Sequence, residues 1–203
     1  MIVDIRDFFA MIGSSRLHRR YTMKTACAFT GHRPKSFPWK YDETASGCIL
    51  LKEVLTKQIT VLADSGVTDW FSGMALGTDL WCAQIVLDLQ KENPALKLHC
   101  ILPCEEQADS WNESARGQYY SILEQADSIE YVSRAYHAGC MIDRNHRLVD
   151  SAGLLLAVYN GARRSGTGAT MNYARKMGRK IIVIDPITRR IAYEGIASSL
   201  MWF

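Results

Sequence analysis

The chain has 203 residues, which is enough for one domain with a substantial hydrophobic core. Apolar residues make up 48% of it and charged residues 22%, as in ordinary globular proteins. The 24 Lys and Arg residues outnumber the 21 Asp and Glu residues only slightly, and the resulting net charge of +3 argues against nucleic acid as the main partner.

Residues 1–22 precede the first strand-like run and form a separate N-terminal extension. Their apolar patch at 8–12 follows acidic residues and is too short for a signal peptide core or a membrane span. We expect an extension that is helical or disordered, or a segment lying upstream of a true start at Met23. The main domain is then expected to cover residues 23–203, with no membrane span.

From residue 24 onward, short apolar runs alternate with helical patterns. In chain order the sequence predicts a strand at 26–30, a helix at 45–65, a strand at 68–72, a helix at 78–92, a strand at 96–102, a helix at 110–126, a strand at 128–132, a helix at 141–151, a strand at 153–159, a helix at 169–177 and a strand at 180–185.

This alternation predicts an α/β fold, namely a single Rossmann-like, doubly wound domain with a mostly parallel sheet of about six strands. The runs at 154–158 and 181–184 are continuously apolar, as expected for strands that are buried on both faces. The tail at 191–203 is apolar enough to dock on the domain or on a second subunit, so a homo-oligomer is expected.

The six cysteines form no C-x-x-C pair, and without a signal peptide they indicate free thiols in a reducing cytoplasm. His99, Cys100 and Cys104 lie close together, but no second ligand pair follows them. We therefore expect no metal.

Three glycine-bearing loops follow predicted strands, where a parallel sheet presents backbone N–H groups and helix N-termini to anionic ligands. The first contains Gly31, His32 and Arg33. Arg33 is suited to gripping a phosphate, whereas His32 is either a ligand contact or a hydrogen-bonded structural histidine. Trp39 and Tyr41, further on, either stack on a base or pack over the sheet edge.

The second loop runs from Ser72 to Asp79, and its candidate ligand-binding residues are Gly73, Met74, Ala75, Gly77, Thr78 and Asp79. Thr78 and Asp79 are both good helix N-caps. Asp79 would be repelled by phosphate, so its alternative role is to hold a ribose hydroxyl.

The third loop offers Asn160, Gly166, Thr167, Gly168 and Thr170 ahead of a helix whose positive end can receive a phosphate. Arg163 and Arg164 either close over that anion or face solvent. Arg144 and Asn145, on the preceding helix, complete the ligand-binding candidates.

In combination, these three loops, Leu102-Pro103 with Gln107 and Trp111, and Arg144-Asn145 with Val149-Asp150 resemble the YpsA-like family of the SLOG superfamily. The resemblance implies a Rossmann-like fold that binds a nucleoside phosphate, ADP-ribose or an NAD derivative. Relatives in the superfamily include the Lonely Guy phosphoribohydrolases and the DNA-processing protein A.

One departure from those phosphoribohydrolases concerns catalysis, because Thr170 stands where their Gly-Gly-x-Gly-Thr-x-x-Glu motif carries its Glu. No other nucleophile–base set is apparent, so the catalytic residues stay unassigned. The main hypothesis is a cytoplasmic nucleotide-binding or sensing protein. The alternative is a hydrolase or transferase that acts on the N-glycosidic or phosphate bond through Asp79, Glu105, Glu106 or Asp150.

Overall fold

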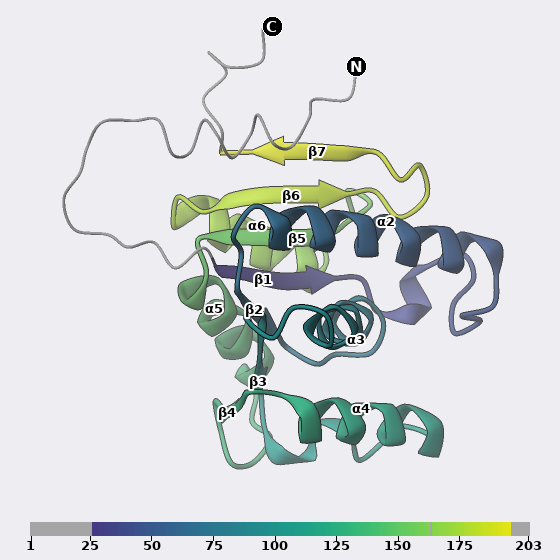
Figure 1. Cartoon of the computed structure of the whole chain (residues 1–203). Coiled ribbons are helices and arrows are strands. Elements are labelled where there is room, and N and C mark those ends of the chain that lie inside the picture. Colours follow the sequence, from purple (N-terminus) through teal and green to yellow (C-terminus); the bar gives the residue numbers. More distant parts are fainter. Residues whose placement is uncertain (1–25, 163, 196–203) are drawn as a thin grey trace, which may run out of the picture.

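A computed structural model describes residues 26–162 and 164–195, and Figure 1 shows their arrangement. In chain order the elements are β1 (Ala26–Gly31), the 3-10 helix η1 (Pro34–Ser36), α2 (Ser46–Asp64), β2 (Asp69–Ser72), α3 (Thr78–Gln90), β3 (Lys97–Leu102), the 3-10 helix η2 (Glu105–Ala108), α4 (Glu113–Gln125), β4 (Ser128–Tyr131), α5 (Cys140–Ser151), β5 (Leu154–Val158), α6 (Gly166–Lys176), β6 (Lys180–Ile184) and β7 (Ile191–Glu194).

The strands form one seven-stranded sheet in the order β4-β3-β2-β1-β5-β6-β7. Every neighbouring pair is parallel except β6 and β7, which are antiparallel. From β1 the chain builds outward to β4 and then returns to place β5 on the other side of β1. The strand order therefore reverses between β1 and β5, and such a switch point is where open α/β sheets bind their ligands.

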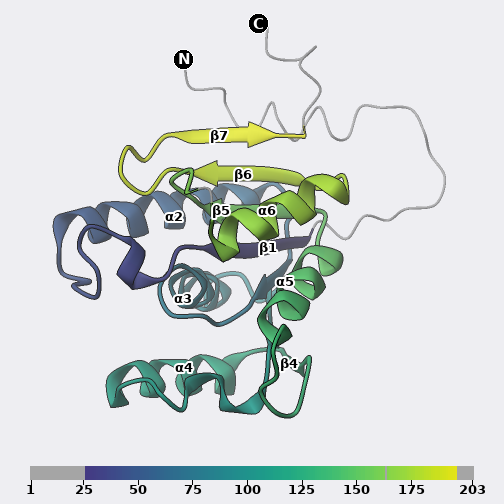
Figure 2. The same ribbon diagram turned by 180° about the vertical axis from the view of Figure 1, so that it is seen from behind.

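Helices cover both faces of the sheet, with α2 and α3 on one face and α5 and α6 on the other (Figures 1 and 2). Alternate residues of the buried strands serve the two faces. In β1, Phe29 belongs to the core cluster under α2 and α3, whereas Ala28 belongs to the cluster under α5 and α6. In β5, Leu156 and Leu155 divide in the same way. This two-sided burial confirms the predicted doubly wound α/β class.

Several elements differ from the sequence prediction by up to three residues at their boundaries; α4, for example, begins at Glu113 rather than at residue 110, and the 3-10 helices η1 and η2 were not predicted. Helix α6 begins at Gly166 rather than at residue 169, because the Ser165 hydroxyl caps it by accepting a hydrogen bond from the Gly168 N–H at 3.0 Å. The tail contributes a seventh strand, β7, which the prediction of about six strands did not include. Its docking on the domain is confirmed for residues 191–194, and docking on another subunit stays a prediction.

The expected extension at residues 1–22 and the apolar end of the tail at 200–203 lie outside the described residues. Within the described part of the chain, no helix has the length and apolar character needed to cross a membrane.

Candidate functional site

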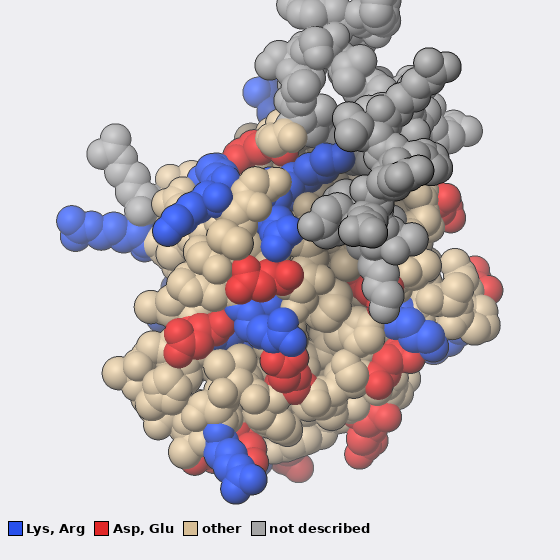
Figure 3. Space-filling view, turned by 90° about the vertical axis from the view of Figure 1, so that its left-hand side faces the viewer, with Lys and Arg blue, Asp and Glu red and all other residues tan. Residues whose placement is uncertain are grey.

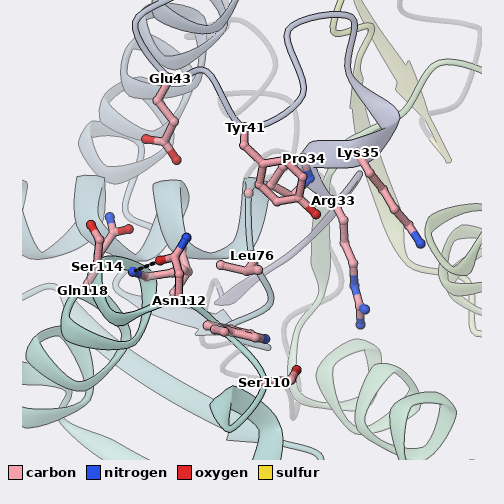
Figure 4. A pocket seen from close by; sticks show the side chains of 14 residues that line it. Arg33, Pro34, Lys35, Tyr41, Glu43, Leu76, Ser110, Asn112, Ser114 and Gln118 are labelled. Atoms are coloured by element: carbon pink, nitrogen blue, oxygen red, sulfur yellow. Dashed lines mark hydrogen bonds between the residues drawn. The ribbon is translucent and has the colours of Figure 1, made fainter.

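The carboxyl ends of the parallel strands carry a crevice made of three adjoining cavities that all reach Arg33. The inner cavity, of about 310 Å³, lies between the loop after β1 and the N-terminus of α6. The middle cavity, of about 240 Å³, lies beside η2 and the start of α5. The outer cavity, of about 720 Å³, lies between the segment after β1 and α4 (Figure 4). The inner cavity coincides with the switch point of the sheet.

The floor of the inner cavity contains a buried ion pair that joins two of the predicted site residues. Arg144 Nη1 donates to Asp79 Oδ2 at 3.2 Å, and both side chains are at most 7% exposed. The Ala75 N–H also lies 3.4 Å from Asp79 Oδ2. Burial raises the pKa of the Asp79 carboxyl, and the adjacent Arg144 guanidinium opposes that rise. The Asp79 carboxylate thus already accepts hydrogen bonds from Arg144 and from the backbone, although it still lines the cavity.

Glycines of the first two loops let backbone and side chains approach closely behind the cavity. A Cβ on Gly73 would stand 1.3 Å from Arg144 Nη1, and a Cβ on Gly31 would stand 2.4 Å from Thr78 Oγ1. The Thr78 hydroxyl donates to the His32 carbonyl at 3.2 Å, which joins the two loops. The cavity wall thus depends on glycine at these positions for packing.

Three other residues of the second loop have different environments. Met74 is fully buried in a left-handed conformation with φ 57° and lines none of the three cavities. Gly77 has φ +88° and borders the outer cavity. Ala75 borders both the inner and the middle cavities.

His32 and Asn160 connect the ends of β1 and β5. His32 is 4% exposed, and its Nε2 lies 2.7 Å from Asn160 Oδ1. The same Oδ1 accepts from the Ala162 N–H at 3.1 Å, and the Asn160 backbone N–H lies 3.2 Å from His32 Nε2, so both the side chain and the backbone of Asn160 hold the imidazole. His32 therefore has the hydrogen-bonded structural role foreseen for it while also lining the inner cavity.

The N-terminus of α6 forms the opposite wall of the inner cavity. Gly166 and Thr167 line it, and a Cβ on Gly166 would meet nothing within 4 Å, so the backbone there is open to a ligand. Gly168 and Thr170 do not line it: the Gly168 N–H serves the Ser165 cap, and the Thr170 hydroxyl donates to the Gly166 carbonyl at 2.9 Å.

Three exposed cations surround the inner cavity. Arg33, Lys35 and Arg164 all line it, and none of them forms an ion pair within residues 26–162 and 164–195. Arg33 has only a distant contact from its Nη2 to the Met141 sulfur, at 3.9 Å. Asn145, predicted from the sequence, lies in the same wall. The cavity therefore has an excess of positive charge around an open helix N-terminus, as an anion site requires.

The acidic residues that the enzymatic alternative requires are dispersed. Asp150 accepts a hydrogen bond from the Tyr173 hydroxyl at 3.2 Å, away from the crevice. Glu105 lines none of the three cavities, whereas Glu106 lines the middle one and accepts from the Tyr136 N–H at 2.8 Å. Glu106 is therefore the candidate acid that borders the crevice without an ion-pair partner in the described residues.

The middle cavity also contains Gln107, which the family resemblance singled out. Its Nε2 donates to the carbonyls of Gly73 at 3.2 Å and of Met74 at 2.6 Å, and its buried Oε1 has no partner among the described residues. Gln107 thus connects η2 to the loop that carries Asp79.

The cysteines have no site of their own in the described part of the chain. All six are free and buried, and burial raises the pKa of Cys100 to about 12. No group of three or more His, Cys, Asp or Glu side chains suited to a metal ion occurs among the described residues.

Sequence reasoning named Arg33, Arg164 and Tyr41, but it overlooked most of the outer cavity and the third exposed cation, Lys35. Lys35 directly follows the Gly31–Pro34 motif and could have been found from that position. Ser114 and Gln118 belong to an amphipathic helix with no motif, so only the packing of α4 brings them to the crevice.

Comparison with known proteins finds a matching family model and similar bacterial proteins. The YpsA family model, described as the YspA SLOG family, matches residues 27–188. A UPF0398 protein of Bacillus pumilus is 38% identical over 138 residues, which cover 66% of this chain and 72% of that protein. A UPF0398 protein of Bacillus cereus is 33% identical over 156 residues, which cover 74% of this chain and 83% of that protein.

Two solved structures have a similar fold. DNA processing protein A from Streptococcus pneumoniae superimposes with a TM-score of 0.54 at 15% identity, over 84% of this chain and 54% of that one. The Helicobacter pylori protein, whose structure concerns its single-stranded DNA binding mode, gives 0.55 at 16% identity, over 80% and 66%. This chain thus matches about half of the first protein and about two thirds of the second.

Proposed function

The chain belongs to the YspA SLOG family, and from that premise we propose that its crevice binds a nucleotide or nucleotide derivative and acts as a sensing site. The observation that carries the proposal is the inner cavity. There Arg33, Lys35 and Arg164, without ion pairs in the described chain, surround the N-terminus of α6 at the switch point of the sheet.

The ligand's phosphate lies in the inner cavity under this proposal. Gly166 and Thr167 line it at the N-terminus of α6, and a phosphate there interacts favourably with the helix dipole by about 0.3–2 kcal/mol. Arg33, at the junction of the three cavities, grips the phosphate from the opposite side. Asp79 keeps Arg144 in place and leaves the phosphate to the exposed cations.

Binding rather than turnover is the favoured activity. Thr170 occupies the position at which the phosphoribohydrolase motif has its Glu, and its hydroxyl bonds to the Gly166 carbonyl. Among the acids proposed for catalysis, Glu106 borders the middle cavity, but its carboxylate accepts a hydrogen bond from the Tyr136 N–H. The Asp79 carboxylate accepts a hydrogen bond from Arg144. With free, buried cysteines, we place the protein in the cytoplasm.

Isothermal titration with AMP, ADP, ADP-ribose and NAD, followed by chromatography of the mixtures, tests this function. We expect binding without product, and Arg33→Met should weaken it about tenfold or more because a charge-assisted bond to phosphate is lost. Arg116→Met is the matched control, since Arg116 is exposed on α4 and lines none of the cavities. No binding of any of the four compounds would refute the proposal, and release of base or phosphate would favour the enzymatic alternative.

Single-stranded DNA is the second candidate ligand, because the Helicobacter pylori neighbour binds it and the three cavities share the exposed cation Arg33. Away from the crevice, the side of the molecule in Figure 3 carries Lys and Arg interspersed with Asp and Glu, outside the parts covered in grey. The part of this face that is not covered therefore offers DNA no uniformly basic surface. A steep fall in oligonucleotide affinity with salt, steeper than for AMP, would favour this candidate.

A further inference from the structure

The outer cavity is the largest of the three. A phosphate bound in the inner cavity does not occupy it. Its volume is about 720 Å³, within the range of small-molecule sites. It shares Arg33 and Lys35 with the inner cavity. A ligand whose phosphate contacts Arg33 from the inner side therefore has room to continue into the outer cavity.

Flat apolar groups line part of this cavity. Tyr41 is 65% exposed, and it lines the cavity together with Leu76 (Figure 4). The nearby Trp111 also lines the cavity and is held edge-on against Tyr119 with ring centroids 5.3 Å apart. An exposed tyrosine and a fixed indole offer stacking surface to a planar group.

The outer cavity contains a carboxylate, Glu43, that two hydrogen bonds hold in place. Glu43 Oε1 accepts from Trp81 Nε1 at 2.9 Å, and Glu43 Oε2 accepts from Lys52 Nζ at 2.5 Å. The remaining lone pairs of this carboxylate can accept hydrogen bonds from further N–H groups. The outer cavity is thus suited to a group that carries hydrogen-bond donors.

Polar side chains on α4 form the facing wall. Ser114 and Gln118 are one turn apart on the helix, so they share a face, and both line the cavity. Within the described residues neither side chain makes a hydrogen bond, in contrast to Asn112, whose Oδ1 caps the helix through the Ala115 N–H at 2.8 Å. An amide and a hydroxyl left unused in this way can pair with the edge of a base or with a sugar hydroxyl.

From these walls we infer that the outer cavity is the nucleoside subsite of the crevice. The base lies against Tyr41 and Trp111, and its edge faces Glu43 and Gln118. This inference rests on the proposed function, which places the phosphate in the inner cavity. Because Glu43 accepts hydrogen bonds, bases with an exocyclic amino group (adenine, guanine or cytosine) are favoured over uracil.

The test fills the outer cavity and leaves the inner one intact. Ser114→Trp places an indole in the nucleoside subsite, and Ser121→Trp makes the same change on α4 at a residue that lines none of the cavities. Titrations of both variants and the wild type use AMP, GMP, UMP and inorganic pyrophosphate. We expect Ser114→Trp to weaken AMP and GMP about tenfold or more and to leave pyrophosphate unchanged, since stacking and base contacts alone are lost.

A second variant and the pyrophosphate measurements make the outcomes separable. Tyr41→Ala removes an exposed ring without disturbing the core, and it should weaken AMP and GMP while leaving pyrophosphate unchanged. Equal loss for pyrophosphate and nucleotides, or no loss for nucleotides in either variant, would overturn the nucleoside subsite while the proposed function stands. Failure of every probe to bind the wild type would overturn the proposed function itself.

Discussion

The crevice contains two sets of charges with opposite surroundings. Asp79 and Arg144 are buried and paired with each other, whereas Arg33, Lys35 and Arg164 are exposed along the rim and have no ion pair in the described chain. The buried pair joins α3 to α5 and fixes the floor of the inner cavity. The exposed cations remain solvated, so they incur little desolvation penalty in the folded protein and are available to a ligand.

The contrast teaches that position in a binding crevice does not decide a residue's role. A buried charge that loses its partner is strongly destabilising, so such residues are expected to govern folding. An exposed cation that loses its charge alters stability little, so it is expected to govern affinity.

The largest effect is expected from Arg144→Met, which leaves the Asp79 carboxylate buried and without its partner. The free energy of unfolding should fall by about 3–5 kcal/mol in urea denaturation. The double variant Asp79→Asn with Arg144→Met should be more stable than Arg144→Met alone, because it removes the unpaired charge. A cost below about 1 kcal/mol for Arg144→Met would contradict the assigned role of the pair.

Two glycines that look alike in sequence should respond differently to alanine. Gly73→Ala would place a Cβ 1.3 Å from Arg144 Nη1 and displace the guanidinium from Asp79, so we expect a loss of about 1–3 kcal/mol. Gly166→Ala meets nothing within 4 Å, so its unfolding energy should stay within about 0.5 kcal/mol of the wild type while its affinity for AMP falls. Equal destabilisation of the two variants would contradict the conclusion that Gly73 is needed for packing at the cavity floor whereas Gly166 is open to a ligand.

The hydrogen bonds of His32 and Asn160, which connect β1 and β5, should have an intermediate effect on stability, because His32 is buried and yet lines the inner cavity. Asn160→Ala removes the Oδ1 acceptor 2.7 Å from His32 Nε2 and should cost about 1–2 kcal/mol. Asn145→Ala, in the same cavity wall, should cost less than about 0.5 kcal/mol because its side chain makes no hydrogen bond in the described residues. Thermal unfolding of both variants measures the difference, and equal Tm values would contradict it.

The architecture could be predicted because it follows from sequence patterns within single strands and helices. Continuous apolar runs such as Leu154–Val158 identify strands buried on both faces, and their alternation with helices predicts a parallel sheet. The glycine loops were correctly placed at the strand ends for the same reason. Strand β7 was missed because its four residues gain stability only from antiparallel pairing with β6.

The candidate site was less predictable because it depends on contacts between distant residues. Asp79 and Arg144 are 65 positions apart, and no spacing rule joins them. Likewise, Gly73 has the sequence appearance of a phosphate loop, but its lack of a side chain accommodates Arg144. The outer cavity depends on the packing of α4, which periodicity locates along the chain but not in space.

The smallest effect concerns Asp127, a carboxylate that is neither fully buried nor part of the rim, with its side chain 22% exposed. Its burial alone would raise its pKa, but Lys97 Nζ at 3.0 Å, the Leu98 N–H and Gln90 outweigh that effect and lower the pKa. A carboxyl with a lowered folded-state pKa stabilises the protein above its unfolded-state pKa, and this contribution disappears as the pH falls through the folded-state value.

Asp127→Asn should therefore lower the unfolding energy by about 1 kcal/mol at neutral pH, and the difference from the wild type should vanish as the pH falls through the lowered folded-state pKa. Urea denaturation at neutral and at acidic pH measures it. Asp88→Asn is the control, because Asp88 forms an exposed pair with Lys91 that contributes less than about 0.5 kcal/mol. If the Asp127→Asn difference persisted unchanged in acid, packing rather than charge would account for it. The charge of this partly buried carboxylate would then not contribute a stabilisation between that of the buried Asp79–Arg144 pair and that of the exposed cations.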